Sequence, residues 1–152
     1  MSQPPGSPFA NSVASDTPTT KSPRRLKHMR PQDVAAAVDR DPRLIIPVGT
    51  CEQHGPHLPL GSDSIIVERL SCDLSAEFGV LVAPTVEYGV NVVTERGFAG
   101  NASLRKKTLH RLLNDLLDTW ESTGIREFIL LTAHEHDPHL EALSTLITSG
   151  AR

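Results

Sequence analysis

Short apolar runs alternate along this chain with longer segments of helical periodicity, and that alternation constrains the fold more than any other feature. The runs at 44–48, 80–83 and 128–131 are continuous, as in strands that are buried on both faces. Helical periodicity marks the segments between and beyond them, at 32–38, 63–78, 104–122 and 139–148. Strands that alternate with helices favour a three-layer α/β/α fold with a mostly parallel sheet.

Two of the predicted helices have recognisable local signals. In the helix that begins at Ser62 or Asp63, Ile66, Leu70 and Leu74 recur every four residues, and Phe78 extends this row. Ser103 is suited to cap the following helix, because its hydroxyl can accept a hydrogen bond from a free backbone N–H in the first turn.

The N-terminal segment differs from the rest of the chain in composition. Residues 1–28 are rich in proline, serine and threonine and end in a basic stretch. Such a segment cannot bury enough apolar surface to offset the entropy lost on ordering. We therefore expect a disordered tail over 1–28 and a single α/β domain over 29–152.

Bulk composition excludes several classes of function. The net charge of −3 gives no reason to expect a nucleic-acid partner. No apolar run approaches the roughly 20 residues that span a bilayer, so we expect no membrane partner. Cys51 and Cys72 belong to no paired motif. A disulfide framework is therefore not expected, and a reducing, cytoplasmic location is the expectation.

The segment after the first predicted strand gathers potential metal ligands. Glu52 and His54 are two residues apart, so in an extended segment both side chains point to one side. Asp63, at the start of the next helix, can point back to the same place. A carboxylate and an imidazole together suit a borderline divalent metal. Taken singly, each residue is more simply a solvated carboxylate or a hydrogen-bonded structural histidine.

A second cluster follows the third predicted strand, where His134 and His136 again share a side of an extended segment. The carboxyl ends of neighbouring parallel strands meet at one edge of a sheet, so the two clusters should converge. Two groups of two or three ligands suit a site for two metal ions.

The sequence from Glu52 to Asp63, EQHGPHLPLGSD, resembles the signature of the creatininase family almost residue for residue. The resemblance extends over about 31–150 and includes Val82-Ala83-Pro84, Phe98-Ala99-Gly100-Asn101 and Ala133-His134. It implies a creatininase-like α/β fold. Family members are longer, so we expect this chain to correspond to the N-terminal part of a family member, with a domain that is incomplete at its C-terminus.

The resemblance also implies a ligand set for two divalent ions, zinc or manganese, with iron as a further option. It assigns Glu52, His54 and His134 as ligands and makes Asp63 the bridge between the ions. For the fifth ligand we favour His136 over Glu135, which is one residue out of register in an extended segment. His57, the second histidine of the signature, either contacts substrate or orients its own loop.

The implied reaction is hydrolysis of a non-peptide C–N amide bond, in creatinine-like cyclic amides or related formamides, by a hydroxide held on the two ions. Peptide amides are a related substrate class. The alternative is a truncated, weakly active or inactive family member that binds metal or self-associates. In either case we expect a homo-oligomer and a small-molecule amide as the natural partner.

Overall fold

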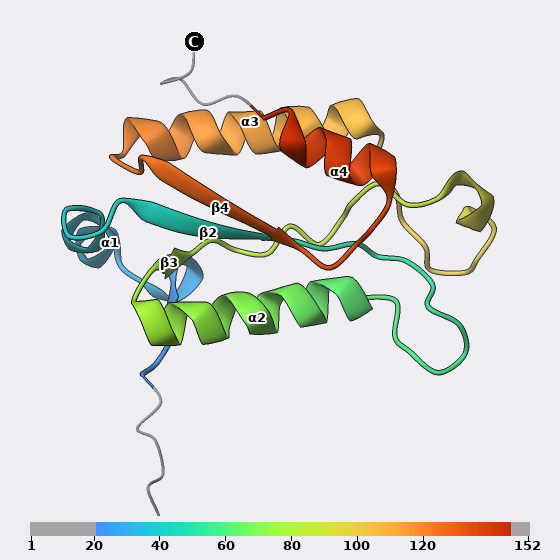
Figure 1. The fold of residues 1–152 in the computed structure, drawn as a ribbon, viewed down its shortest axis with the longest axis horizontal. Helices are drawn as coiled ribbons and strands as arrows, with labels where there is room; N and C mark the ends of the chain where they lie inside the picture. The colour runs from blue at the N-terminus through green and yellow to red at the C-terminus, as the bar shows by residue number, and fades with distance from the viewer. Residues whose placement is uncertain (1–20, 147–152) are drawn as a thin grey trace, which may run out of the picture.

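A parallel four-stranded sheet forms the centre of the computed structural model, which describes residues 21–146 (Figure 1). The strands lie in the order β1-β3-β2-β4, and every paired neighbour is parallel. Their bounds are β1 Arg24–Arg25, β2 Arg43–Val48, β3 Leu81–Val82 and β4 Glu127–Thr132. This confirms the predicted α/β class and parallel sheet.

Helices cover both faces of the sheet (Figure 1). α2 (Ser62–Phe78) lies on one face, while α3 (Lys106–Ser122) and α4 (Asp137–Ser144) lie on the other. α1 (Pro31–Val38) adds Ala37 and Val38 to the core on the α3 side. Two short 3-10 helices, η1 (Leu26–His28) and η2 (Val93–Glu95), complete the regular structure of the described chain.

Alternate side chains of β2 enter two hydrophobic cores. Leu44, Ile46 and Val48 belong to the larger core, beside α3, and all three are fully buried. Ile45 faces the smaller core, beside α2. Burial on both faces explains why this strand is a continuous apolar run in the sequence.

α2 packs on the sheet through small and polar residues, whereas much of its apolar row is at the surface. Ser71 and Ser75 are buried, but Ile66 and Leu70 are 56% and 49% exposed. The Ser75 hydroxyl accepts from the Arg24 N–H and donates to the Val80 carbonyl, at 2.8 and 2.6 Å. The helix is therefore as predicted, but small serine side chains, of which Ser75 is hydrogen-bonded to Arg24 and Val80, lie on the side that faces the sheet.

Three predicted boundaries are wrong. Residues 24–28 form β1 and η1, so the ordered domain begins before residue 29, because β1 pairs with β3. Arg105, not Ser103, occupies the N-cap position of α3 and makes no capping hydrogen bond through its side chain, while the Ser103 hydroxyl accepts from the Asn91 N–H. α4 begins at Asp137, since Pro138 is suited to the first helical turn. The expected tail over 1–20 and the end of the last helix at 147–148 lie outside the described residues.

Candidate metal centre

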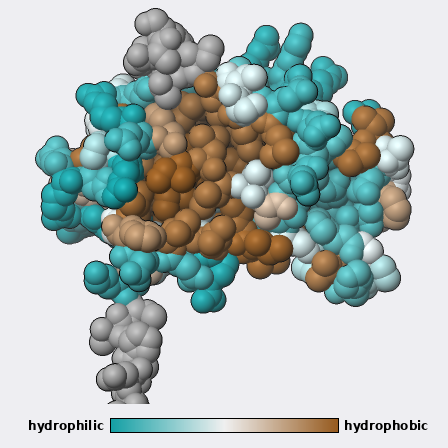
Figure 2. Space-filling model, in the orientation of Figure 1, coloured by the Kyte–Doolittle hydropathy of each residue, from teal (hydrophilic) through white to brown (hydrophobic). Residues whose placement is uncertain are grey.

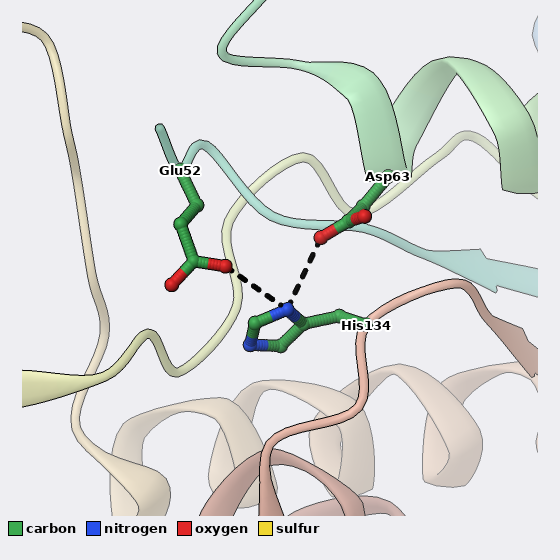
Figure 3. A group of neighbouring side chains, drawn as sticks. All are labelled: Glu52, Asp63 and His134. Carbon is green, nitrogen blue, oxygen red and sulfur yellow. Dashed lines mark ion pairs between the residues drawn. The ribbon is translucent and has the colours of Figure 1, made fainter. Parts of the chain in front are cut away.

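Three acidic and imidazole side chains from separate segments meet beyond the carboxyl ends of β2 and β4 (Figure 3). Glu52 lies four residues after the end of β2, Asp63 is the second residue of α2, and His134 lies two residues after β4. One ligand atom of each lies within 4.8 Å of the others, and all three residues are buried.

The orientation of His134 determines what this group can bind. Its Nε2 lies 3.1 Å from the Val90 carbonyl oxygen, which can only accept, so Nε2 carries the proton in the neutral ring. Nδ1 then presents a lone pair to Glu52 Oε2 and Asp63 Oδ2, each 3.1 Å away. A lone pair facing two carboxylate oxygens is repulsive unless a proton or metal cation lies among them. The donor set therefore fits a divalent metal.

Asp63 makes a second, similar contact through its other oxygen. His54 Nδ1 lies 2.9 Å from the Glu52 carbonyl oxygen, which fixes the proton of a neutral ring there. His54 Nε2 then faces Asp63 Oδ1 at 3.2 Å. The Thr50 hydroxyl donates to Asp63 Oδ2 at 2.6 Å and fixes the carboxylate. The two oxygens of Asp63 thus face two different imidazole nitrogens.

Electrostatics at the site follow from burial. Desolvation raises the pKa of Glu52 above its ordinary value, and the nearby His134 opposes that rise. Burial also acts to lower the pKa of His54, but its contacts with the Glu52 carbonyl and the Asp63 carboxylate raise it overall. The rise at His54 reflects the negative charge around it, whereas the rise at Glu52 reflects chiefly the desolvation of its carboxylate.

His139 is fully buried directly behind His134, although its sequence position predicts only a place at the start of a helix. Its ring meets the His134 ring edge-on, with centroids 5.0 Å apart. The Val90 N–H donates to His139 Nδ1 at 3.2 Å, and Nε2 lies 3.1 Å from the Thr132 hydroxyl. Burial, with the nearby His134 ring, lowers the pKa of His139 to about 4, so the ring is neutral at pH 7.

Val90 therefore positions both rings through its backbone: its N–H holds His139, and its carbonyl holds His134. The preceding Gly89 allows this close approach, since a Cβ there would lie 2.6 Å from His139 Nδ1. The loop that follows β3 also holds the first cluster, because the Val92 N–H donates to Glu52 Oε1 at 3.4 Å.

The predicted site residues divide into two groups. Glu52, His54, Asp63 and His134 lie together. The remaining candidates lie outside the group of three ligands: the His136 ring is 6.1 Å from the His134 ring, and both Glu135 and His57 are exposed. The identity of a fifth ligand and the role of His57 stay predictions.

A family model described as creatinine amidohydrolase, or creatininase, matches residues 27–149. A mycofactocin precursor peptide peptidase of Mycolicibacterium smegmatis is 32% identical over 115 residues, which are 70% of this chain and 44% of that protein. A 3-dehydro-scyllo-inosose hydrolase of Thermotoga maritima is 32% identical over 60% of this chain and 29% of that protein. A creatinine amidohydrolase of Pseudomonas putida is 30% identical over 60% and 36%.

Solved structures share the fold. A manganese form of creatininase superposes with a TM-score of 0.73 at 23% identity, over 80% of this chain and 50% of that one. A Zn-Zn form of a creatininase mutant gives 0.73 at 24%, over 79% and 49%. This chain thus spans half or less of these proteins. Because one relative is named as a peptide peptidase, the comparisons do not support the predicted restriction to non-peptide bonds. No helix in residues 21–146 is long and apolar enough to cross a membrane.

Proposed function

The chain belongs to the creatininase family, and from that premise we propose that it acts in metal-dependent hydrolysis of a C–N amide bond. The observation that carries the proposal is the His134 Nδ1 lone pair, directed at the Glu52 and Asp63 carboxylates at 3.1 Å. Three buried ligands that would repel one another when empty favour a divalent cation.

The contact of the second Asp63 carboxylate oxygen supports a second ion. Oδ1 faces His54 Nε2 while Oδ2 faces His134 Nδ1, which is the arrangement expected of a carboxylate that bridges two ions. Structural neighbours are manganese and Zn-Zn forms, and imidazole with carboxylate suits both metals. We therefore favour zinc or manganese over iron.

The metal ions and the side chains would have separate roles in the reaction. A bound metal pair supplies Lewis-acid polarisation of the amide carbonyl and acidifies water near neutral pH. Glu52, His54, Asp63 and His134 would hold the ions, with one Asp63 oxygen toward each imidazole. Thr50 keeps the Asp63 carboxylate in place through the 2.6 Å hydrogen bond. His57 is exposed and stays a candidate for contact with substrate.

The substrate proposed is a small molecule with an amide bond, and both cyclic amides and short peptides belong to the class. A cytoplasmic location suits such a metabolic reaction. The test combines metal content with turnover of creatinine, simple formamides and dipeptides by metal-replete protein. Turnover that a chelator abolishes and metal restores supports the proposal. Stoichiometric metal without turnover of any of the amides would favour the alternative, a metal-binding chain without hydrolase activity.

A further inference from the structure

Asn91 lies between two backbone groups that hold different members of the candidate metal centre. The peptide before it holds His134, because the Val90 carbonyl accepts from Nε2 at 3.1 Å. The peptide after it holds Glu52, because the Val92 N–H donates to Oε1 at 3.4 Å. Since Asn91 joins these two peptides, its backbone conformation sets how the two candidate ligands approach each other.

The Asn91 side chain also contacts the backbone of the first ligand cluster. Its Nδ2 donates to the Cys51 carbonyl at 2.8 Å, and the two residues are 40 positions apart in the sequence. That carbonyl belongs to the peptide that leads into Glu52, and it also accepts from the Ala102 N–H at 3.0 Å. The N–H of the same peptide donates to the Leu60 carbonyl at 2.9 Å. The peptide before Glu52 is therefore held at both ends, and Asn91 holds it through a side chain.

Burial and the direction of its amide fix the Asn91 side chain in one orientation. The residue is 5% exposed, and its backbone N–H donates to the Ser103 hydroxyl at 2.9 Å. Nδ2 also lies 3.5 Å from the Ala102 carbonyl oxygen. Because carbonyl oxygens only accept, both contacts place Nδ2 on the Cys51 side. Oδ1 is buried and meets no donor within residues 21–146, so in this part of the chain the side chain makes its hydrogen bonds through Nδ2.

The segment around Asn91 has little apolar packing of its own. Figure 2 shows a broad apolar surface over β4 and a mainly hydrophilic surface at the end of the molecule where the loop after β3 lies. Within residues 90–92, Val90 belongs to the larger hydrophobic core, whereas Val92 is 37% exposed. The position of this segment relative to Cys51 therefore depends mainly on hydrogen bonds.

We propose that Asn91 is a positioning residue for the metal centre, and that its contact with the Cys51 carbonyl sets the separation at which Glu52 and His134 can bind one ion. The inference rests on the metal-dependent function proposed above. Without the contact, residues 90–92 could shift relative to Cys51, and the two ligands held by that segment would shift relative to each other. Ligands that must first be ordered bind more weakly, so loss of the contact should lower metal affinity and alter coordination geometry.

The test compares Asn91→Ala with Asn101→Ala in the 152-residue chain. Asn101 belongs to the same loop, its Nδ2 donates to the Glu95 carbonyl at 2.8 Å, and its Oδ1 is likewise buried without a donor among the described residues. Each variant loses one hydrogen bond from an amide to a backbone carbonyl, and that carbonyl keeps a second backbone donor in both cases. Any general loosening of the loop should therefore be similar in the two variants, as urea denaturation would measure.

Metal binding should distinguish the two variants. Competition titration should show a zinc affinity about tenfold lower in Asn91→Ala and unchanged in Asn101→Ala. The visible absorption of the cobalt(II)-loaded protein supplies a second readout, because its bands depend on ligand geometry. This spectrum should change in Asn91→Ala and match the wild type in Asn101→Ala. If the alanine variant does not fold, Asn91→Ser gives the same comparison, since its side chain is one atom too short to place a donor at the Nδ2 position.

Three results would overturn the inference. Equal zinc affinity and an identical cobalt spectrum in the wild type and Asn91→Ala would overturn it and leave the proposed metal centre intact. Equal losses in Asn91→Ala and Asn101→Ala would also overturn it, because they would show general loosening of the loop. A wild-type chain that binds neither zinc nor cobalt would overturn both this inference and the proposed function.

Discussion

His134 Nδ1 and Asp63 Oδ2 lie 3.1 Å apart at the meeting point of β4 and α2, and neither atom carries a proton when the ring is neutral and the carboxylate ionised. This relationship distinguishes the site from an ordinary ion pair. Because the Val90 carbonyl holds the His134 proton on Nε2, the Nδ1 lone pair faces the carboxylates. Changes to either partner should therefore be measured first as changes in metal affinity.

Asp63→Asn should weaken metal binding more than His136→Ala. Asp63 faces both His54 and His134, whereas the His136 ring lies 6.1 Å from that of His134. The substitution preserves shape but removes the charge, and we expect both ions to be weakened. Isothermal titration with zinc measures the two affinities. Equal or smaller losses from Asp63→Asn would show that Asp63 does not bridge.

The control for this substitution is Asp41→Asn. Asp41 also bonds its neighbours as a carboxylate, but it does so with Arg43 at the opposite end of β2. Metal affinity should be unchanged in this variant. If Asp41→Asn also lost metal affinity, the effect of Asp63→Asn would reflect the general stability of the fold.

His139→Leu should weaken metal binding by about 10–100-fold, as is typical when a residue that orients a ligand is lost. His139 accepts the Val90 N–H and packs edge-on against His134, so its loss frees the Val90 peptide and the ligand ring. His110→Leu is the matched control, since His110 lies partly exposed on α3. Metal affinity measured alongside thermal unfolding separates positioning from stability. A lower melting temperature with unchanged affinity would show that His139 only fills the core.

Gly89→Ala should destabilise the protein by about 1–3 kcal/mol, the usual range for overpacking a filled core. A Cβ at this position would lie 2.5 Å from Thr50 Cγ2 and 2.6 Å from His139 Nδ1. Gly97→Ala is the control, because a Cβ at Gly97 would meet open space. Urea denaturation compares the free energies of unfolding. Equal values for the two variants would contradict the packing described for the loop.

The Asp41–Arg43 pair predicts a pH dependence of stability that is separate from the metal centre. Hydrogen bonds from the Arg43 guanidinium hold the pKa of Asp41 below its ordinary value of 3.8. A lowered folded pKa means that the pair stabilises the fold above that ordinary value and loses its contribution as pH falls through the folded pKa. The wild type should therefore exceed Asp41→Asn in unfolding free energy at pH 7, and the difference should shrink in acid. A difference that persists in acid would exclude this linkage.

Much of the fold was predictable because its elements are locally encoded. β2 and β4 are continuous apolar runs, and α3 buries Leu109, Leu113 and Leu117 at helical spacing. β1 was missed because Arg24 and Arg25 form a strand only through backbone pairing with β3. The exposure of Ile66 and Leu70 was not predictable either, since periodicity predicts a helix without identifying which side faces the sheet.

The candidate ligands were predictable from their spacing after two strands, but the residues that hold them in place were not. Val90 contributes through its backbone, which carries no sequence signal. The role of His139 depends on the path of a loop 49 residues earlier. The signature from Glu52 to Asp63 indicated candidate ligands, whereas tertiary structure alone places His57 and Glu135 at the surface.

Anomalous diffraction from crystals grown with zinc or manganese tests the central claim most directly. We expect a peak among His134 Nδ1, Glu52 Oε2 and Asp63 Oδ2, and a second between Asp63 Oδ1 and His54 Nε2. Ligand distances of roughly 2.0–2.2 Å would be consistent with zinc coordination. Metal-replete crystals with no anomalous peak among these side chains, or with peaks only elsewhere, would contradict the claim.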